Sequence, residues 1–304
     1  MLAQFTSARH THGDITIHYR IGGSGPPLLL LHGYPQTHLV WHKVAPALAQ
    51  HFTVVMPDLR GYGDSSKPPG RSDHSNYSKR VMAQDVVDLM QHLGHPAFRV
   101  CGHDRGGRVA HRLALDHPTA VLQMMLIDIA PTLTMYEATE QRFARLYYHW
   151  FMLIQPAPLP ETLIGNSAAF FLDTTLGGWG SHTVDFIDPV VRAEYHRCFC
   201  DPAAIHASCE DYRASASIDL AHDRADAQHR IACPVKVIWG EHGVVGTLFD
   251  PLSAWRAKSD GEVSGSAFPA GHFIPEQMPH ELTAEMLAFF GAVNEDSGAC
   301  RITP

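Results

Sequence analysis

The sequence predicts an α/β fold: a mostly parallel sheet with helices on both faces and an inserted, mainly helical cap. Three observations predict it. Short apolar segments alternate with amphipathic ones along most of the 304-residue chain, as expected of parallel strands joined by helices. Residues 98–108 have the pattern of an apolar strand, a sharp turn and a helix. Residues 131–222 break the alternation with a stretch rich in aromatic side chains, which predicts helices and loops.

The individual elements follow from apolar spacing. Residues 28–31 are a short apolar run typical of a buried central strand, whereas residues 15–21 alternate and predict an antiparallel strand. Residues 79–93 gather apolar side chains toward one side, which predicts an amphipathic helix. In chain order, we expect strands at 15–21, 28–31, 52–56, 98–102, 121–129 and 235–239, and helices at 38–50, 79–93 and 107–115.

The break in the alternation predicts how the chain is divided. We expect an α/β core domain made of residues 1–130 and 223–304, with residues 131–222 as a helical cap subdomain between them. Ligands of open α/β sheets bind outside the carboxyl ends of the strands. The cap should therefore cover those ends and enclose a binding site.

Composition excludes several classes of function. The chain is 45% hydrophobic and 18% charged, and its formal net charge of -8 disfavours a nucleic-acid partner. It contains no apolar run of the roughly 20 residues that a membrane span needs. The first seven residues lack the pattern of a signal peptide, and the six cysteines are scattered, which predicts reduced thiols in a cytoplasm. The 22 histidines show no metal-ligand spacing, so we expect no metal.

The turn at Gly102-His103-Asp104-Arg105-Gly106 carries the chemistry. It matches the nucleophile elbow of hydrolases, with Asp104 where serine is usual. A carboxylate is already ionised at neutral pH and can displace a leaving group from saturated carbon, giving an ester that water must hydrolyse. Asp104 therefore predicts opening of an epoxide or displacement of a halide, and argues against an esterase or peptidase. The alternative is that Asp104 only caps the helix that follows.

Hydrolysis of such an ester needs a general base and a carboxylate that orients it. His272, in Pro269-Ala-Gly-His-Phe-Ile, is the candidate base, because histidine has the appropriate pKa range. It could instead be a packing residue. Two residues compete to be the partner acid: Asp128, at the end of the strand after the elbow strand, and Glu241, which follows Trp239-Gly240.

Two arginines lie within one helical turn of Asp104. Arg105 and Arg108 are three residues apart, hence on one face of the helix. Two guanidinium groups beside a nucleophile are appropriate for a substrate that carries a carboxylate. An epoxide would not require them. The alternative is that Arg108 pairs with a surface acid.

Several motifs resemble known proteins over essentially the whole chain. The sequence resembles the α/β-hydrolase superfamily and, within it, is similar to the fluoroacetate dehalogenases. The general markers are His32-Gly-Tyr-Pro35, Asp58 with Gly61-Tyr-Gly63, and Gly271-His-Phe273. The narrower markers are Asp104-Arg-Gly-Gly-Arg108, Asp128-Ile-Ala-Pro131, Tyr148-His-Trp150 and Glu210-Asp-Tyr-Arg213. Gly107, where alanine is expected, and Tyr34, where phenylalanine is frequent, depart from the pattern.

The resemblance implies roles for these residues. It favours Asp128 over Glu241 as the acid, since no aspartate stands at the usual offset after Trp239. It implies that His149, Trp150 and Tyr212 donate hydrogen bonds to the departing halide. The backbone N–H groups of Tyr34 and Arg105 would form the oxyanion hole, and Trp179 would line the pocket. Trp150 and Tyr212 could instead belong to the cap core, and Trp179 could do so equally well.

The sequence therefore predicts a haloacetate dehalogenase that converts a small haloacid such as fluoroacetate to glycolate. Neither a metal nor an organic cofactor is implied, and the resemblance suggests a homodimer. Two alternatives stay open. One is an epoxide hydrolase in which Tyr212 protonates the ring oxygen. The other is a non-catalytic small-molecule receptor on the same fold, since fold does not determine function.

Overall fold

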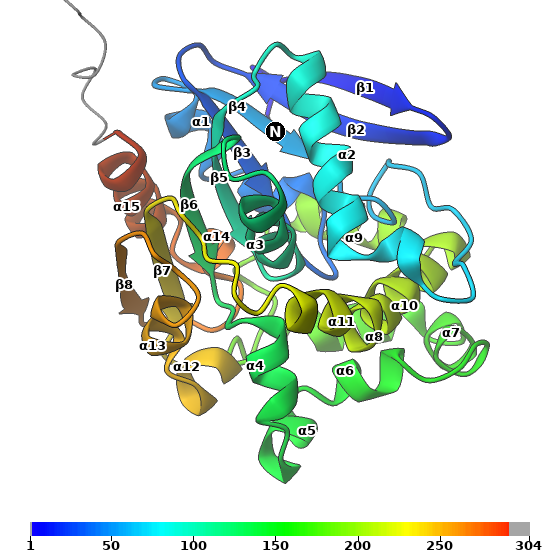
Figure 1. The fold of residues 1–304 in the computed structure, drawn as a ribbon. Helices are drawn as coiled ribbons and strands as arrows, with labels where there is room; N and C mark the ends of the chain where they lie inside the picture. Colours follow the sequence, from blue (N-terminus) through cyan, green and yellow to red (C-terminus); the bar gives the residue numbers. More distant parts are fainter. Residues whose placement is uncertain (1, 292–304) are drawn as a thin grey trace, which may run out of the picture.

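The computed structural model describes residues 2–291 (Figure 1), so the end of the predicted core segment 223–304 lies outside the described residues. Within them, one eight-stranded sheet has the order β1-β2-β4-β3-β5-β6-β7-β8. The strands are β1 (Thr6–His12), β2 (Ile15–Gly22), β3 (Pro27–Leu31), β4 (Thr53–Pro57), β5 (Phe98–His103), β6 (Val121–Ile127), β7 (Val235–Gly240) and β8 (Val263–Phe268).

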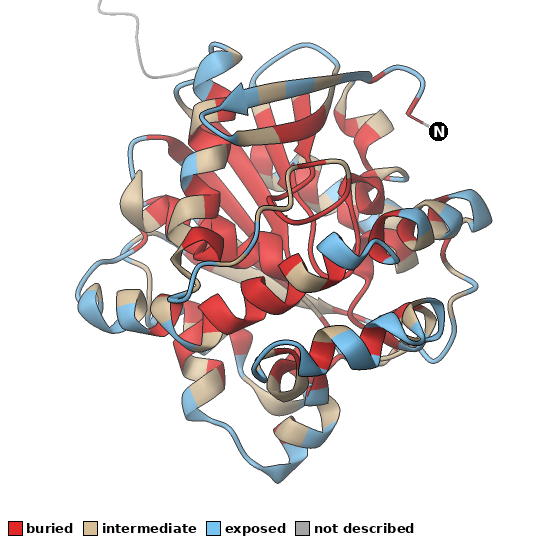
Figure 2. Ribbon diagram, turned by 90° about the vertical axis from the view of Figure 1, so that its right-hand side faces the viewer, coloured by how far each residue is buried: buried red, intermediate tan, exposed pale blue. Residues whose placement is uncertain are grey.

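The predicted parallel sheet is confirmed. Strands β4, β3, β5, β6, β7 and β8 pair in parallel, whereas the β1–β2 and β2–β4 pairs at one edge are antiparallel. The four leucines 28–31 in β3 are fully buried, as a strand covered on both faces requires. Figure 2 shows the buried sheet surrounded by helices whose outer faces are exposed.

Helices cover both faces of this sheet. On one face, α2 (Lys79–His92) packs against α3 (Arg105–Asp116), and α1 (Ala45–Leu48) contacts α15 (Pro279–Gly291) on the other (Figure 1). The remaining helices of the core are short: η1 (His38–Trp41), η2 (Ser75–Tyr77), α12 (Val244–Leu248), α13 (Pro251–Arg256) and α14 (Ile274–Gln277). The part of the chain that the structure describes contains no helix long and apolar enough to cross a bilayer.

Three local predictions were wrong. The helix expected at 38–50 is a 3-10 turn, η1, followed by the single turn α1. Pro46 lacks the backbone N–H that a helix interior needs, so η1 cannot continue past it, whereas proline is tolerated in the first turn of the new helix α1. Strand β6 ends at Ile127, two residues early, because Asp128 adopts a φ of 50°. Strand β1 was missed because its sequence, Thr-Ser-Ala-Arg-His-Thr-His, is polar and mostly exposed at the sheet edge.

The segment between β6 and β7 forms a largely helical layer (Figure 1). Its helices are α4 (Thr132–Glu137), α5 (Gln141–Leu146), α6 (Tyr148–Leu153), α7 (Leu159–Gly165), α8 (Ala168–Leu176), α9 (Pro189–Phe199), α10 (Pro202–Ala216) and α11 (Ile218–Ala225). The predicted boundary at 222 falls inside α11. Treating this layer as a separate cap subdomain stays a prediction.

Candidate active site

Asp104 stands on a strained turn between β5 and α3. Its backbone has φ 47° and ψ -114°, a conformation that side chains rarely adopt. Glycine is required around it: a Cβ at Gly106 would lie 2.5 Å from the carbonyl oxygens of Leu31 and His32. The Asp104 side chain makes no capping hydrogen bond to α3 and is 6% exposed. The turn therefore presents a buried carboxylate that the helix does not use.

The two oxygens of Asp104 have different surroundings. Oδ1 accepts a hydrogen bond of 2.9 Å from the backbone N–H of Tyr34, and Oδ2 lies 3.8 Å from Nε2 of His272. Burial alone would raise the pKa of Asp104, but its electrostatic interactions with His272 and Arg105 outweigh burial and lower the pKa. The carboxylate is thus held in its ionised form.

His272 is paired with Asp128 and not with Glu241. The Nδ1 atom of His272 lies 2.5 Å from Oδ2 of Asp128, which is fully buried and whose Oδ1 accepts the Gly240 N–H at 2.9 Å. Glu241 is exposed. The backbone of His272 is held by its own N–H, which donates to Trp179 O at 3.1 Å. The Nε2 atom, on the side of Asp104, has no hydrogen-bond partner among the described residues.

Arg105 is clamped by a carboxylate of α10. Its Nε and Nη2 donate to the two oxygens of Asp211 at 3.0 and 2.6 Å, and its guanidinium lies 4.3 Å from the Tyr212 ring centroid. Asp211 also accepts from Tyr62 Oη at 2.6 Å and from Lys79 Nζ. Nη1 of Arg105 is buried without a partner among the described residues. The Nε/Nη2 edge of the guanidinium is therefore fixed, and Nη1 stays available to donate a hydrogen bond.

Arg108 is also buried, at 3% exposure, and does not pair with a surface acid. Its Nη1 donates to Ala130 O at 3.2 Å and Thr132 Oγ1 at 2.9 Å, and its guanidinium stacks 4.7 Å above the Trp150 ring. Burial and the neighbouring Arg105 lower the pKa of Arg108. In the described part of the chain, its Nε donates to no acceptor. Two cations thus lie close together beside Asp104. Arg105 is paired with Asp211, whereas Arg108 has no carboxylate partner among the described residues.

The three predicted halide donors lie close together. His149 and Trp150 stand on α6, and their rings lie 5.5 and 6.4 Å from that of Tyr212 on α10. Burial lowers the pKa of His149 to about 3, so its ring is neutral and carries one N–H donor. The described residues supply no partner for His149 Nδ1 or Tyr212 Oη. The Trp179 ring packs between two rings of the site, 4.5 Å from the His149 ring and 5.1 Å from the His272 ring.

Sequence reasoning missed three side chains of this site. We expected only the backbone of Tyr34 to take part, but its ring stacks 6.1 Å from His149 and packs 5.2 Å from Tyr212. Tyr147 lies 5.1 Å from His149 and directly precedes the Tyr148-His-Trp150 motif, which could have indicated it. Asp211 stands inside the Glu210–Arg213 motif, but the sequence contains no sign that it binds Arg105.

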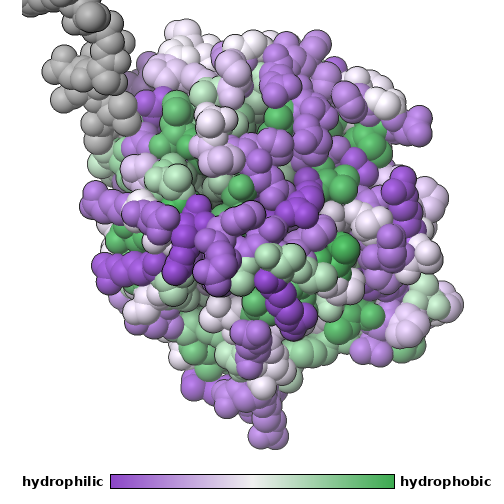
Figure 3. All heavy atoms as spheres, in the orientation of Figure 1, coloured by the Kyte–Doolittle hydropathy of each residue, from purple (hydrophilic) through white to green (hydrophobic). Residues whose placement is uncertain are grey.

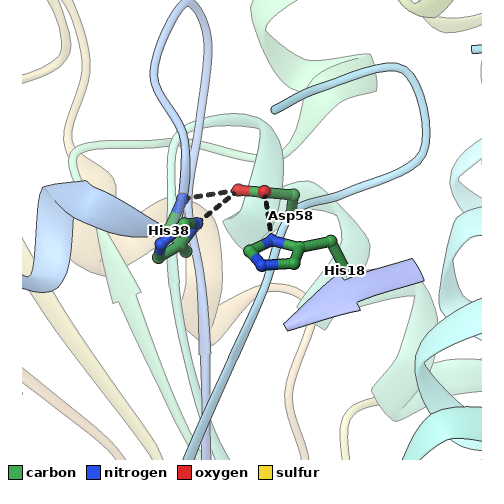
Figure 4. A group of neighbouring side chains, drawn as sticks. All are labelled: His18, His38 and Asp58. Carbon is green, nitrogen blue, oxygen red and sulfur yellow. Dashed lines mark hydrogen bonds and ion pairs between the residues drawn. The ribbon is translucent and has the colours of Figure 1, made fainter. Parts of the chain in front are cut away.

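A separate buried cluster has the geometry of a possible metal site. Within the described residues, His18, His38 and Asp58 bring one ligand atom each within 4.8 Å of one another. Figure 4 shows both imidazoles pointing at the carboxylate, with each Nδ1 2.8 Å from an Asp58 oxygen. Asp58 also accepts the backbone N–H groups of His38 and Asp64 at 2.9 and 3.0 Å. Four donors satisfy this carboxylate, so the cluster fits a hydrogen-bonded support for the loop after β4.

Comparison with known proteins places these features among hydrolases. Residues 26–277 match the family described as alpha/beta hydrolase fold. A fluoroacetate dehalogenase from Burkholderia sp is 47% identical over 278 residues, which cover 91% of each chain. A soluble epoxide hydrolase from Corynebacterium sp. (strain C12) is 34% identical over 278 residues, covering 90% of this chain and 93% of the relative. A solved structure from Nostoc sp PCC 7120, described as an α/β hydrolase, has a TM-score of 0.94 and 53% identity, and covers 96% of this chain and 100% of its own.

Proposed function

Because the chain belongs to the α/β-hydrolase superfamily and, within it, to the fluoroacetate dehalogenase family, we propose that this hydrolase displaces halide, fluoride included, from haloacetates and releases glycolate. One observation carries the proposal. A buried, ionised Asp104 lies beside His272 with its acid Asp128, and beside two buried arginines that keep unpaired N–H groups. This set combines a carboxylate nucleophile, a base for ester hydrolysis and charge for a carboxylate substrate.

In the first step, Oδ2 of Asp104 attacks the carbon that bears the halogen. A C–O bond forms, the carbon–halogen bond breaks, and the halide leaves with the electron pair. The guanidinium groups of Arg105 and Arg108 hold the substrate carboxylate. Donors from His149, Trp150 and Tyr212 stabilise the departing halide, because charge develops there in the transition state.

In the second step, His272 takes a proton from water, and the oxygen of that water attacks Cγ of the Asp104 ester. The backbone N–H groups of Tyr34 and Arg105 stabilise the oxyanion on Oδ1. When the tetrahedral intermediate collapses, the Cγ–Oδ2 bond breaks and glycolate leaves with a proton from His272. Asp128 stabilises the imidazolium that exists between these proton transfers.

A second candidate function is epoxide hydrolysis. It is supported by the relative named soluble epoxide hydrolase and by the buried hydroxyls of Tyr34 and Tyr212, which have no partner among the described residues and could protonate a ring oxygen. Arg108 favours the haloacid, since it is buried without a carboxylate partner among the described residues and a neutral epoxide would not compensate its charge. Incubation with fluoroacetate, chloroacetate and an epoxide, with fluoride, chloride and diol measured, separates these functions. A non-catalytic receptor would release none of the three.

The covalent intermediate provides the direct test. We predict that Asp104→Ala abolishes turnover, and that His272→Asn stops only ester hydrolysis. Haloacetate should therefore leave an adduct on the Asp104 peptide of the His272→Asn protein, detected by mass spectrometry. An unmodified Asp104 peptide after prolonged incubation would refute the two-step scheme.

A further inference from the structure

A basic hollow of about 420 Å³ opens beside the candidate active site. It lies between α5, the loop that joins α8 to α9, and the start of α12. The ionisable side chains that line it are Arg142, Arg145, His182 and His242, all exposed. None of its lining residues is an aspartate or glutamate, although the chain has a formal net charge of -8. Hydrophilic side chains cover the α5 tip, at the bottom of the view in Figure 3.

The inner wall of this hollow is thin. Trp179 lines it, and the ring of the same residue packs 5.1 Å from the His272 ring and 4.5 Å from the His149 ring. Gly243 lines it too, and a Cβ at Gly243 would lie 3.3 Å from both carboxylate oxygens of Asp128. One indole ring and one stretch of backbone therefore separate the hollow from the candidate catalytic groups.

The candidate catalytic groups need a route for their substrate. Asp104, Asp128 and His272 are 6%, 0% and 1% exposed, so a haloacetate must pass a wall of the site to reach them. Trp179 is the partly exposed member of the wall around His272, and it lies between Gly178 and Gly180. Its φ of 51° is unfavourable for tryptophan, so the indole is held on a strained stretch of backbone. The hollow therefore leads to the partly exposed part of this wall.

We propose that this hollow is an anion-binding vestibule, in which Arg142 and Arg145 attract short halocarboxylates before they pass Trp179. The identity of the anion rests on the proposed function, whereas the binding of anions does not. A concave surface of one charge sign raises the local concentration of ions of the opposite sign and their rate of entry. The effect depends on ionic strength, because salt screens charges over the Debye length.

The size of the effect can be worked out. For two cations about one Debye length (~10 Å at 0.1 M) from the passing anion in water, removing both should lower kcat/KM about threefold at 0.01 M ionic strength. At 0.15 M the loss should be under about twofold, because the Debye length is then ~8 Å. The double variant Arg142→Gln/Arg145→Gln should therefore have a lower kcat/KM for haloacetate at low salt, and its kcat/KM should depend little on salt. Arg224→Gln is the matched control, since Arg224 is an exposed arginine on α11 that does not line the hollow.

A second measurement does not require turnover. Iodide quenching of tryptophan fluorescence, compared between the parent and Trp179→Phe, reports the anion concentration near Trp179. The double variant should show about threefold weaker iodide quenching at 0.01 M ionic strength and unaltered quenching by neutral acrylamide. If acrylamide quenching falls by the same factor, the variant has altered access and not charge, and the vestibule is refuted.

The two measurements separate the two proposals. If iodide quenching is weaker in the double variant than in the parent but the protein releases no halide, the anion vestibule is supported and the dehalogenase is refuted. Halide release with the same salt dependence of kcat/KM in the parent and the double variant would refute the vestibule and leave the dehalogenase. The expected result is halide release together with a salt-dependent loss in the double variant and none in Arg224→Gln.

Discussion

Replacing Asp211 with asparagine should destabilise the protein and weaken substrate binding together. The carboxylate is fully buried and accepts hydrogen bonds from Arg105, Lys79 and Tyr62. Both cations beside it are themselves buried, at 0% and 4% exposure. Asparagine keeps the shape of the side chain, but it removes the negative charge and turns an NH₂ group toward donors. Arg105 would then lose its carboxylate partner, and Lys79 would keep only the more distant Asp219, whose Oδ2 lies 3.9 Å from Nζ.

The magnitude follows from this arrangement. Removing one partner of a buried ion pair costs about 3–5 kcal/mol, because the remaining charge is buried without compensation. Since the free energy of unfolding of a domain is about 5–15 kcal/mol, a loss of this size should leave the variant folded in most cases. In domains somewhat smaller than this one, each kcal/mol of free energy of unfolding that is lost lowers Tm by about 2–4 °C. Tm should therefore fall by about 6–20 °C.

Thermal unfolding followed by circular dichroism measures this loss, and Asp64→Asn is the matched control. Asp64 pairs with Arg197 on the surface, where the two side chains are 35% and 52% exposed, so the same substitution should cost under about 1 kcal/mol. The KM for haloacetate should rise in Asp211→Asn, since Arg105 loses the contact that orients it. A Tm within 2 °C (about 1 kcal/mol) of the Asp64→Asn protein would show that the charge of Asp211 does not support Arg105.

Three further changes test other parts of the site. Asp128→Asn should slow ester hydrolysis by orders of magnitude while Glu241→Gln should not, and equal losses in single-turnover rates would move the acid role to Glu241. Trp150→Phe keeps the ring under Arg108 but removes the indole N–H, so single-turnover rates should fall more for fluoroacetate than for chloroacetate; equal slowing would make Trp150 a packing residue. Burial raises the pKa of Glu276 to about 8 despite Lys43 and Gln36 nearby, so the folded chain keeps a proton that the unfolded chain releases at lower pH. Stability should therefore fall as the pH rises from about 5 to 8, and Glu276→Gln should flatten that decline in Tm; a parallel decline in both proteins would contradict this assignment.

The sequence predicted the arrangement of β3, β5 and β6 because their apolar runs report burial directly. It also brought Asp104 and His272 together as candidates, since each follows a strand and the carboxyl ends of parallel strands meet at one edge of the sheet. Asp128 and Glu241 both follow strands, so the choice of Asp128 needed the resemblance to a known family. Local patterns contain no such information about contacts between the helical layer and the core. The pairing of Arg105 with Asp211 joins α3 to α10, and it depends on how α10 packs over the sheet.

The same reason explains the other differences. The ring of Tyr34 enters the site only because α6 and α10 bring His149 and Tyr212 onto it. The end of β6 at Ile127 depends on the left-handed backbone of Asp128, which is not visible in an apolar pattern. The homodimer and the cytoplasmic location stay predictions, since both concern surroundings of the chain and not its fold.

The hydrogen bond from Tyr34 N–H to Asp104 Oδ1 makes the two carboxylate oxygens chemically distinct before any substrate arrives. In the proposed reaction, Oδ2 departs inside glycolate, and the oxygen of the attacking water takes its place. Oδ1 stays in the side chain throughout, as long as its hydrogen bond prevents the carboxylate from rotating. Each glycolate would then carry the oxygen of the water consumed one turnover earlier. The first glycolate released by a newly synthesised protein molecule would instead carry the original Oδ2 atom of the Asp104 side chain.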